Sequence, residues 1–160
     1  MSRNTKPRKP YKPKPVAHWF GRDARNDIEI MAHYFAPKLA AGLFDTVDGN
    51  TLAYLLNLCR RIAVMSHYQS MVVTTDVCME AFLSIRQRHD RTGKWGASGE
   101  ELTILEEALP HIGQWIFTQP VHRVEKAREF VLKVNKKIQL AGALFADVTD
   151  DGRLENLVMR

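Results

Sequence analysis

Apolar residues recur at helical spacing in five successive segments of this 160-residue chain. Positions three, four and seven residues apart lie on one face of an α-helix, so each segment predicts an amphipathic helix that turns one face to a common core. Short connections favour antiparallel neighbours. We therefore expect an all-α fold, an antiparallel helical bundle of about five helices, over residues 23–142. The expected helices span residues 23–43, 51–71, 75–89, 98–118 and 120–141.

Turn-forming residues set the expected ends of the second and third helices. The segment 45–49 predicts a turn, which makes Asn50 the N-cap of the second helix. Thr74 or Thr75 is the expected N-cap of the third helix. The glycine-rich segment 90–99 predicts the loop that follows it.

A capping box and three prolines define the other helix ends. Ser98 and Glu101 form the box that opens the fourth helix, because each side chain can bond the backbone amide of the other residue. Pro110 should bend or divide that helix, and Pro37 should do the same in the first, because proline removes a backbone donor. Pro120 suits the first turn of the fifth helix.

The residue pattern predicts no catalytic, metal or cofactor site. Cys59 and Cys78 fall on apolar helix faces, which favours buried free thiols over a disulfide or a reactive pair. No two of the six histidines are three or four residues apart, so the sequence lacks a helical metal pair. No apolar run approaches the ~18 residues that span a membrane. We expect a cytoplasmic protein that is not an enzyme and has no membrane partner.

The N-terminal segment 1–22 is basic and rich in proline. It carries seven Lys and Arg residues and no acid, whereas the remaining residues carry 16 basic and 18 acidic side chains. Four of the seven prolines lie between Lys6 and Pro15, so we expect a disordered tail with polyproline II character. Its cations are candidate contacts for nucleic-acid phosphates. An acidic protein partner and a purely solubilising extension are the alternatives. The candidate contacts are Lys6, Arg8, Lys9, Lys12 and Lys14.

A second candidate lies in the expected loop after the third helix. Arg91 and Lys94 stand beside the aromatic Trp95, and bases stack on such rings while cations hold phosphates. The alternative is a solvated helix end with Trp95 packed over the core, and we favour it.

The fourth and fifth helices carry opposite charge. The segment 98–118 has four glutamates and no Lys or Arg, and the segment 120–139 has six basic residues against two glutamates. We favour charge pairing between these two helices over a DNA-reading face on the fifth.

Three stretches resemble a loose group of small helical proteins encoded by phages, prophages and plasmids of proteobacteria. They are KPYKPKPV in the tail, TGKWGASGEEL at 92–102, and EEALPHIGQW with the amphipathic helix that follows. The resemblance implies a mobile-element origin and supplies no catalytic residues. We expect an accessory protein that binds nucleic acid through its tail, while the body dimerises or docks. The alternative is an inhibitor of a host or defence protein. Residues 143–160 should form a short irregular arm or a small hairpin.

Overall fold

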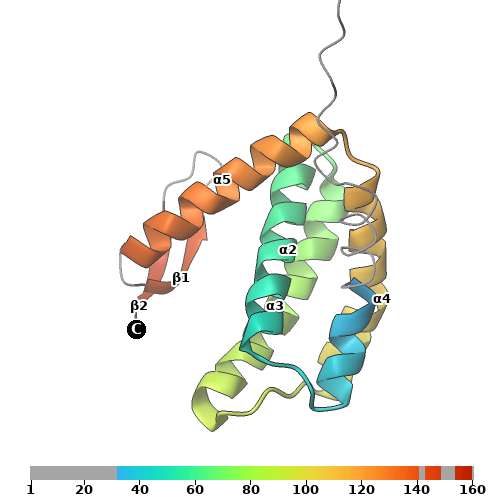
Figure 1. Ribbon diagram of the computed structural model, residues 1–160, viewed down its shortest axis with the longest axis vertical. Coiled ribbons are helices and arrows are strands. Elements are labelled where there is room, and N and C mark those ends of the chain that lie inside the picture. The colour runs from blue at the N-terminus through green and yellow to red at the C-terminus, as the bar shows by residue number, and fades with distance from the viewer. Residues whose placement is uncertain (1–31, 141–142, 149–153, 160) are drawn as a thin grey trace, which may run out of the picture.

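The protein is a helical bundle with a C-terminal β-hairpin (Figure 1). The computed structural model describes residues 32–140, 143–148 and 154–159, with side chains for 32–138 and 140. Residues 32–40 are helical, and four further helices follow them. The elements are α2 (Thr46–Met65), α3 (Gln69–Thr92), α4 (Gly99–Phe117), α5 (Val121–Leu140), β1 (Ala143–Val148) and β2 (Leu154–Met159). The predicted helical bundle is confirmed. The predicted tail 1–22 and residues 23–31 lie outside the described residues.

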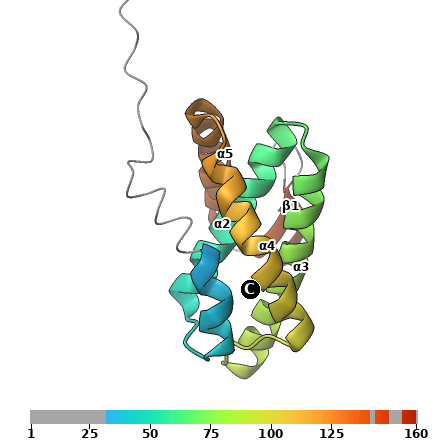
Figure 2. The same ribbon diagram turned by 90° about the vertical axis from the view of Figure 1, so that its right-hand side faces the viewer.

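The core lies between the first helical segment and α2, α3 and α4, which run antiparallel in succession (Figure 2). Leu52, Leu56 and Ile62 of α2 are fully buried. They face Cys78 and Ile85 of α3, in the same apolar cluster. The cluster forms one continuous core along the bundle. It is completed by two aromatic residues and by leucine and isoleucine side chains of α4: Phe35, Phe82, Leu105, Leu109 and Ile112.

The first helical segment ends on a glycine. Gly42 has a φ of +69°, and its amide bonds the carbonyl of Leu39, while the amide of Leu43 bonds the carbonyl of Lys38. This pair of bonds is a Schellman motif, which glycine favours because a left-handed φ costs it nothing. The predicted helix end at Leu43 is therefore too late, and Leu43 is exposed. The helix continues through Pro37.

The predicted turn at 45–49 is wrong, because α2 already begins at Thr46. Asp45, and not Asn50, is the N-cap, and its side chain accepts from the amide of Asp48. The Asp48 side chain accepts in return from the amide of Asp45. The carboxylate of Asp48 also forms an ion pair with Lys38, with 2.8 Å between Nζ and Oδ1, and this pair links the first helical segment to the start of α2.

The predicted start of α3 is also wrong, because the helix begins at Gln69 and neither threonine caps it. Thr75 is instead fully buried inside the helix, where its hydroxyl donates to the carbonyl of Met71 at 2.6 Å. Cys78, Phe82 and Ile85 are buried, whereas Val77 is 43% exposed. It follows that the inner face is centred on Cys78, because one residue turns about 100° around a helix.

The predicted capping box of α4 is confirmed. The hydroxyl of Ser98 accepts from the amide of Glu101, and the Glu101 carboxylate accepts from the amide of Ser98. Pro110 lies inside α4 and does not divide it. The predicted loop 90–99 is shorter than expected, since α3 runs to Thr92.

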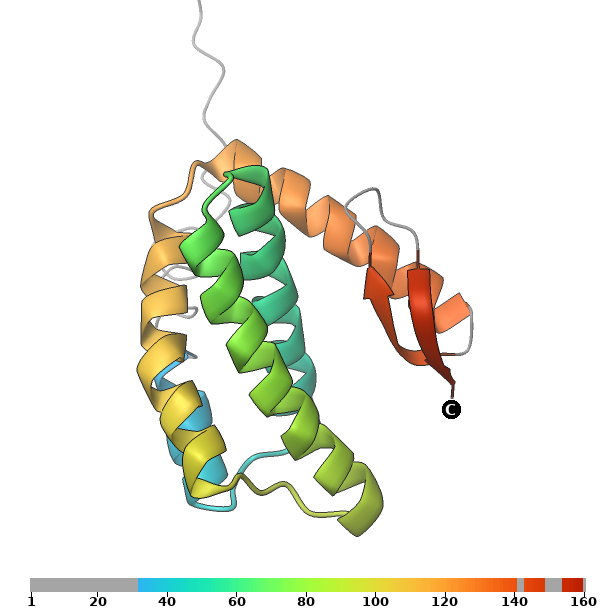
Figure 3. The same ribbon diagram turned by 180° about the vertical axis from the view of Figure 1, so that it is seen from behind.

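Helix α5 leaves the bundle after the turn at 118–120 and crosses α2 (Figure 3). Its buried residues at the start, Val124 and Ala127, belong to the main core. Val131 and Val134 are buried outside that core, and α5 packs there against β1 and β2. The two strands pair antiparallel, with Val148 opposite Leu154. The C-terminal segment is thus a hairpin and not an irregular arm.

Candidate nucleic-acid interface

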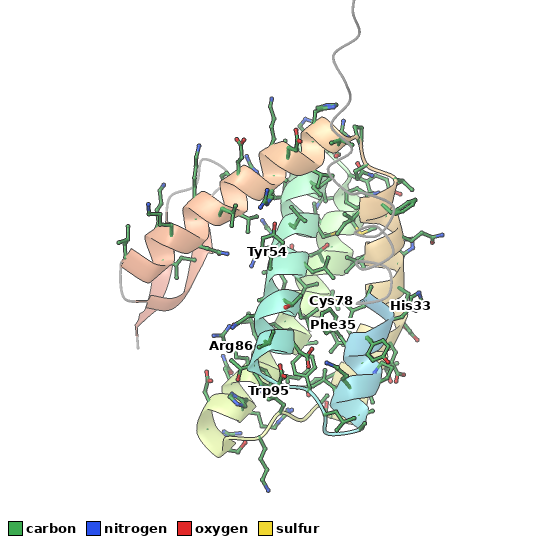
Figure 4. All side chains as sticks on the ribbon, viewed as in Figure 1. His33, Phe35, Tyr54, Cys78, Arg86 and Trp95 are labelled. Carbon is green, nitrogen blue, oxygen red and sulfur yellow. The ribbon has the colours of Figure 1, made fainter. Side chains whose placement is uncertain are left out.

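The loop that follows α3 begins at a left-handed glycine. Gly93 has a φ of +73° and its amide bonds the carbonyl of His89, which ends the helix. The loop then passes under the end of the bundle and places Trp95 against it (Figure 4). Arg91 and Lys94 flank this point and are both exposed.

Trp95 is half-buried among three other rings. Its centroid lies 4.1 Å from that of His89, 5.2 Å from that of Phe44 and 6.4 Å from that of Phe82. The ring also covers Gly49 of α2 so closely that a Cβ there would lie 2.7 Å from its Cη2 atom. The ring is thus part of the packing between α2 and α3. This geometry corresponds to the packed alternative, in which Trp95 closes the core.

One cation of this region, Arg88, is paired with groups of the protein itself. Arg88 donates to both carboxylate oxygens of Glu101 at 2.9 Å and also to the carbonyl of Gly96. The hydrogen bonds from Arg88 lower the pKa of Glu101 to about 2, and the same pairing raises the pKa of Arg88. Arg88 therefore joins α3 to the start of α4. The cations of this region that face solvent are Arg91 and Lys94.

The other predicted contacts lie in the tail. Lys6, Arg8, Lys9, Lys12 and Lys14 all fall outside the described residues. The structure therefore brings together only Arg91, Lys94 and Trp95 among the predicted site residues, and it uses Trp95 for packing.

The structure adds a set of lysines that the sequence reasoning had assigned to internal charge pairing. Lys126, Lys133 and Lys136 of α5 are exposed, and no ion pair between described side chains involves them. Helix α4 packs on α3 and α2, whereas α5 packs on α2 and the hairpin. The predicted charge pairing along α4 and α5 is therefore wrong. The spacing of the lysines already indicated a basic face on α5, but α4 was wrongly taken as the helix that packs along it.

The two cysteines are buried free thiols, as predicted. Burial raises the pKa of Cys59 to about 12, although the Thr75 hydroxyl that donates to its Sγ atom opposes the shift. Burial likewise raises the pKa of Cys78 to about 12. At neutral pH both are protonated, which is the unreactive form.

Within 32–140 and the two strands, no three His, Cys, Asp or Glu residues are grouped closely enough to hold a metal ion. None of the helices in this part of the chain is long and apolar enough to cross a membrane.

The chain matches no protein-family model, and neither the curated proteins nor the solved structures contain a significant match to it.

Proposed function

We propose that this protein is a cytoplasmic accessory protein of a phage or mobile element that binds nucleic acid without reading its sequence. It is not an enzyme in this proposal. The observation that supports this proposal is the charge distribution. Residues 1–22 contain seven cations and no acid, whereas the rest of the chain contains more acidic than basic residues. Lysines and arginines along an extended backbone neutralise phosphates and release counterions whatever the base sequence.

The ion pairs of the folded body support the assignment of phosphate contact to the tail. Three of the body's cations are used in ion pairs that join its own elements, Lys38 to Asp48, Arg60 to Asp76, and Arg88 to Glu101: the N–O distances are 2.8, 2.7 and 2.9 Å. These three cations are therefore engaged within the body and are not free to bind phosphates.

A second candidate function rests on an exposed apolar pair. Val73 and Val77 of α3 are 52% and 43% exposed, and they lie one helical turn apart on the same face. This exposed apolar pair is the observation behind a protein partner, either a host protein or a second copy of the chain. In that case the body acts as an interaction module, and the tail meets an acidic groove of the partner.

A salt titration tests the first proposal. The affinity for a labelled duplex is measured by fluorescence at several salt concentrations, for wild type and for Lys6→Ala/Lys9→Ala/Lys12→Ala. The logarithm of affinity should fall linearly with the logarithm of salt, by about 0.9 per phosphate neutralised, so the variant should lose up to about 2.7 in slope. Two duplexes of unrelated sequence should give the same result.

The comparison variant is Arg91→Ala/Lys94→Ala, which removes the two exposed cations of the second candidate site, in the loop after α3. We expect it to change the slope little. No measurable binding by wild type at low salt would rule out the proposal. Capture of one host protein that survives nuclease treatment and is lost in Val73→Ser/Val77→Ser would favour the second function.

A further inference from the structure

Helix α5 carries a basic surface that the fold leaves open, which we call the lysine face: Lys126, Lys133 and Lys136. All three side chains are exposed. Viewed along the helix axis they lie within about 80° of one another, because each residue turns about 100°. The inward residues Val124, Ala127, Val131 and Val134 lie on the opposite side of the helix.

The packing of α5 fixes the direction of this face. Val124 and Ala127 belong to the main core, so the first half of the helix is held against α2. The guanidinium carbon of Arg61 on α2 lies 3.7 Å from the ring centroid of Phe130, which adds a cation–π contact at the middle of the helix. Val131 and Val134 are buried beyond that point. Rotation that would hide the lysines would expose these apolar residues.

The acidic side chains near the lysine face neutralise it only in part. The exposed glutamates of α4, Glu106 and Glu107, lie on a helix that packs on α3 and α2 and not along α5. On α5 itself Glu129 lies on the same face, three residues after Lys126 and four before Lys133, but no ion pair joins it to them in the described structure. One glutamate offsets one of the three lysine charges. The face therefore keeps a net positive charge.

We propose that the lysine face binds the phosphate backbone of the nucleic acid that the tail engages, and so adds a second anchor on the folded body. This inference rests on the proposed function. Lys126 and Lys136 are ten residues apart, which is about 15 Å along the axis. One strand of a duplex presents about four phosphates over that length. Three lysines can therefore reach separate phosphates of one strand. They have no means of reading bases, because an ammonium group binds phosphate as a point charge.

The test compares charge removal with charge retention in the full chain. Lys126→Gln/Lys133→Gln/Lys136→Gln removes three charges and keeps good helix formers, whereas the corresponding triple arginine variant keeps the charge. Each lost contact should weaken duplex binding about eightfold at 0.1 M salt, and the salt slope should fall by up to about 2.7. The arginine variant should bind like wild type.

The outcomes separate this inference from the proposed function. If Lys6→Ala/Lys9→Ala/Lys12→Ala weakens binding while the glutamine variant of α5 stays within twofold of wild type, the lysine face is not an anchor and the tail function stands. If the α5 variant weakens binding and the tail variant does not, the tail function fails and the lysine face becomes the site. Absence of duplex binding by wild type overturns both. A glutamine variant that binds normally but loses self-association in sedimentation would instead assign this face to a second copy.

Discussion

The contact between Gly49 and Trp95 predicts that a normally stabilising substitution is harmful here. Replacing a helical glycine by alanine usually stabilises a helix by about 1 kcal/mol. At Gly49, however, the new Cβ would lie 2.7 Å from Cη2 and 3.0 Å from Cζ2 of Trp95. Atoms at such distances overlap, so the indole ring has to move.

The indole ring has little room to move. The rings of Phe44, Phe82 and His89 pack against it, with centroid distances of 5.2, 6.4 and 4.1 Å. Overpacking of a well-filled core costs about 1–3 kcal/mol. Subtracting the helix-propensity gain, we expect Gly49→Ala to lower the free energy of unfolding by up to about 2 kcal/mol.

A double-mutant cycle isolates the cause of this loss. Trp95→Ala alone should cost about 3 kcal/mol, because it opens a cavity beside Phe82. With the ring gone, Gly49→Ala should stabilise the protein by about 0.5–1 kcal/mol, so the coupling between the two sites should be about 2 kcal/mol. Urea unfolding followed by far-ultraviolet circular dichroism measures all four variants. A stabilising Gly49→Ala in the wild-type background, or a coupling near zero, would refute the packing role of Trp95.

Three further outcomes follow from the core and its borders. Phe82→Ala should cost roughly 3–5 kcal/mol in urea unfolding, and wild-type stability would show that the inner face of α3 is misplaced. Glu101→Gln keeps the capping contact but loses the charge paired with Arg88, so it should lower stability by about 1–2 kcal/mol at neutral pH. The folded-state pKa of Glu101 is depressed to about 2, so this contribution is present above pH 4.5 and is lost as the pH falls toward 2. In acid titrations the difference in unfolding free energy between wild type and variant should therefore vanish over that range. A difference that stays constant with pH would contradict this assignment. Cys59 and Cys78 should react with a thiol reagent only as fast as the protein opens, so urea should accelerate labelling and rapid labelling of the native protein would contradict their burial.

The parts of the fold that local sequence determines were predictable. The faces of α2, α4 and α5 follow from apolar spacing, since a face is set by the 3.6-residue repeat whatever it packs against. The start of α4 was predictable because the Ser98 hydroxyl and the Glu101 carboxylate satisfy each other within a single turn of chain. In each case the residues that determine the helix face or the helix start lie close together in the sequence.

The start of α2 was missed because its residues also form turns. The aspartates at 45 and 48, Gly49 and Asn50 are all typical of loops. Asp48 takes the place of the Glu or Gln that usually completes a capping box, and its bond to Lys38 comes from another helix. Gly49 is needed because Trp95, 46 residues later, occupies the space that a side chain would fill. These contacts between distant residues decide the element, and no local pattern contains them.

The candidate site also has a part that can be predicted from the sequence and a part that depends on packing. The charge of the tail can be counted from the sequence, and so can the lysines of α5, but whether a lysine faces an acid or solvent depends on the path of the helix. The sequence places acidic α4 directly before basic α5, and a short turn favours an antiparallel pair in which the charges cancel. In the structure α5 packs on α2 and the hairpin, whereas α4 packs on α3 and α2, because α5 leaves the bundle after 118–120. The path of α5, and not the number of its lysines, therefore separates Lys126, Lys133 and Lys136 from the acidic helix and makes them an exposed basic surface.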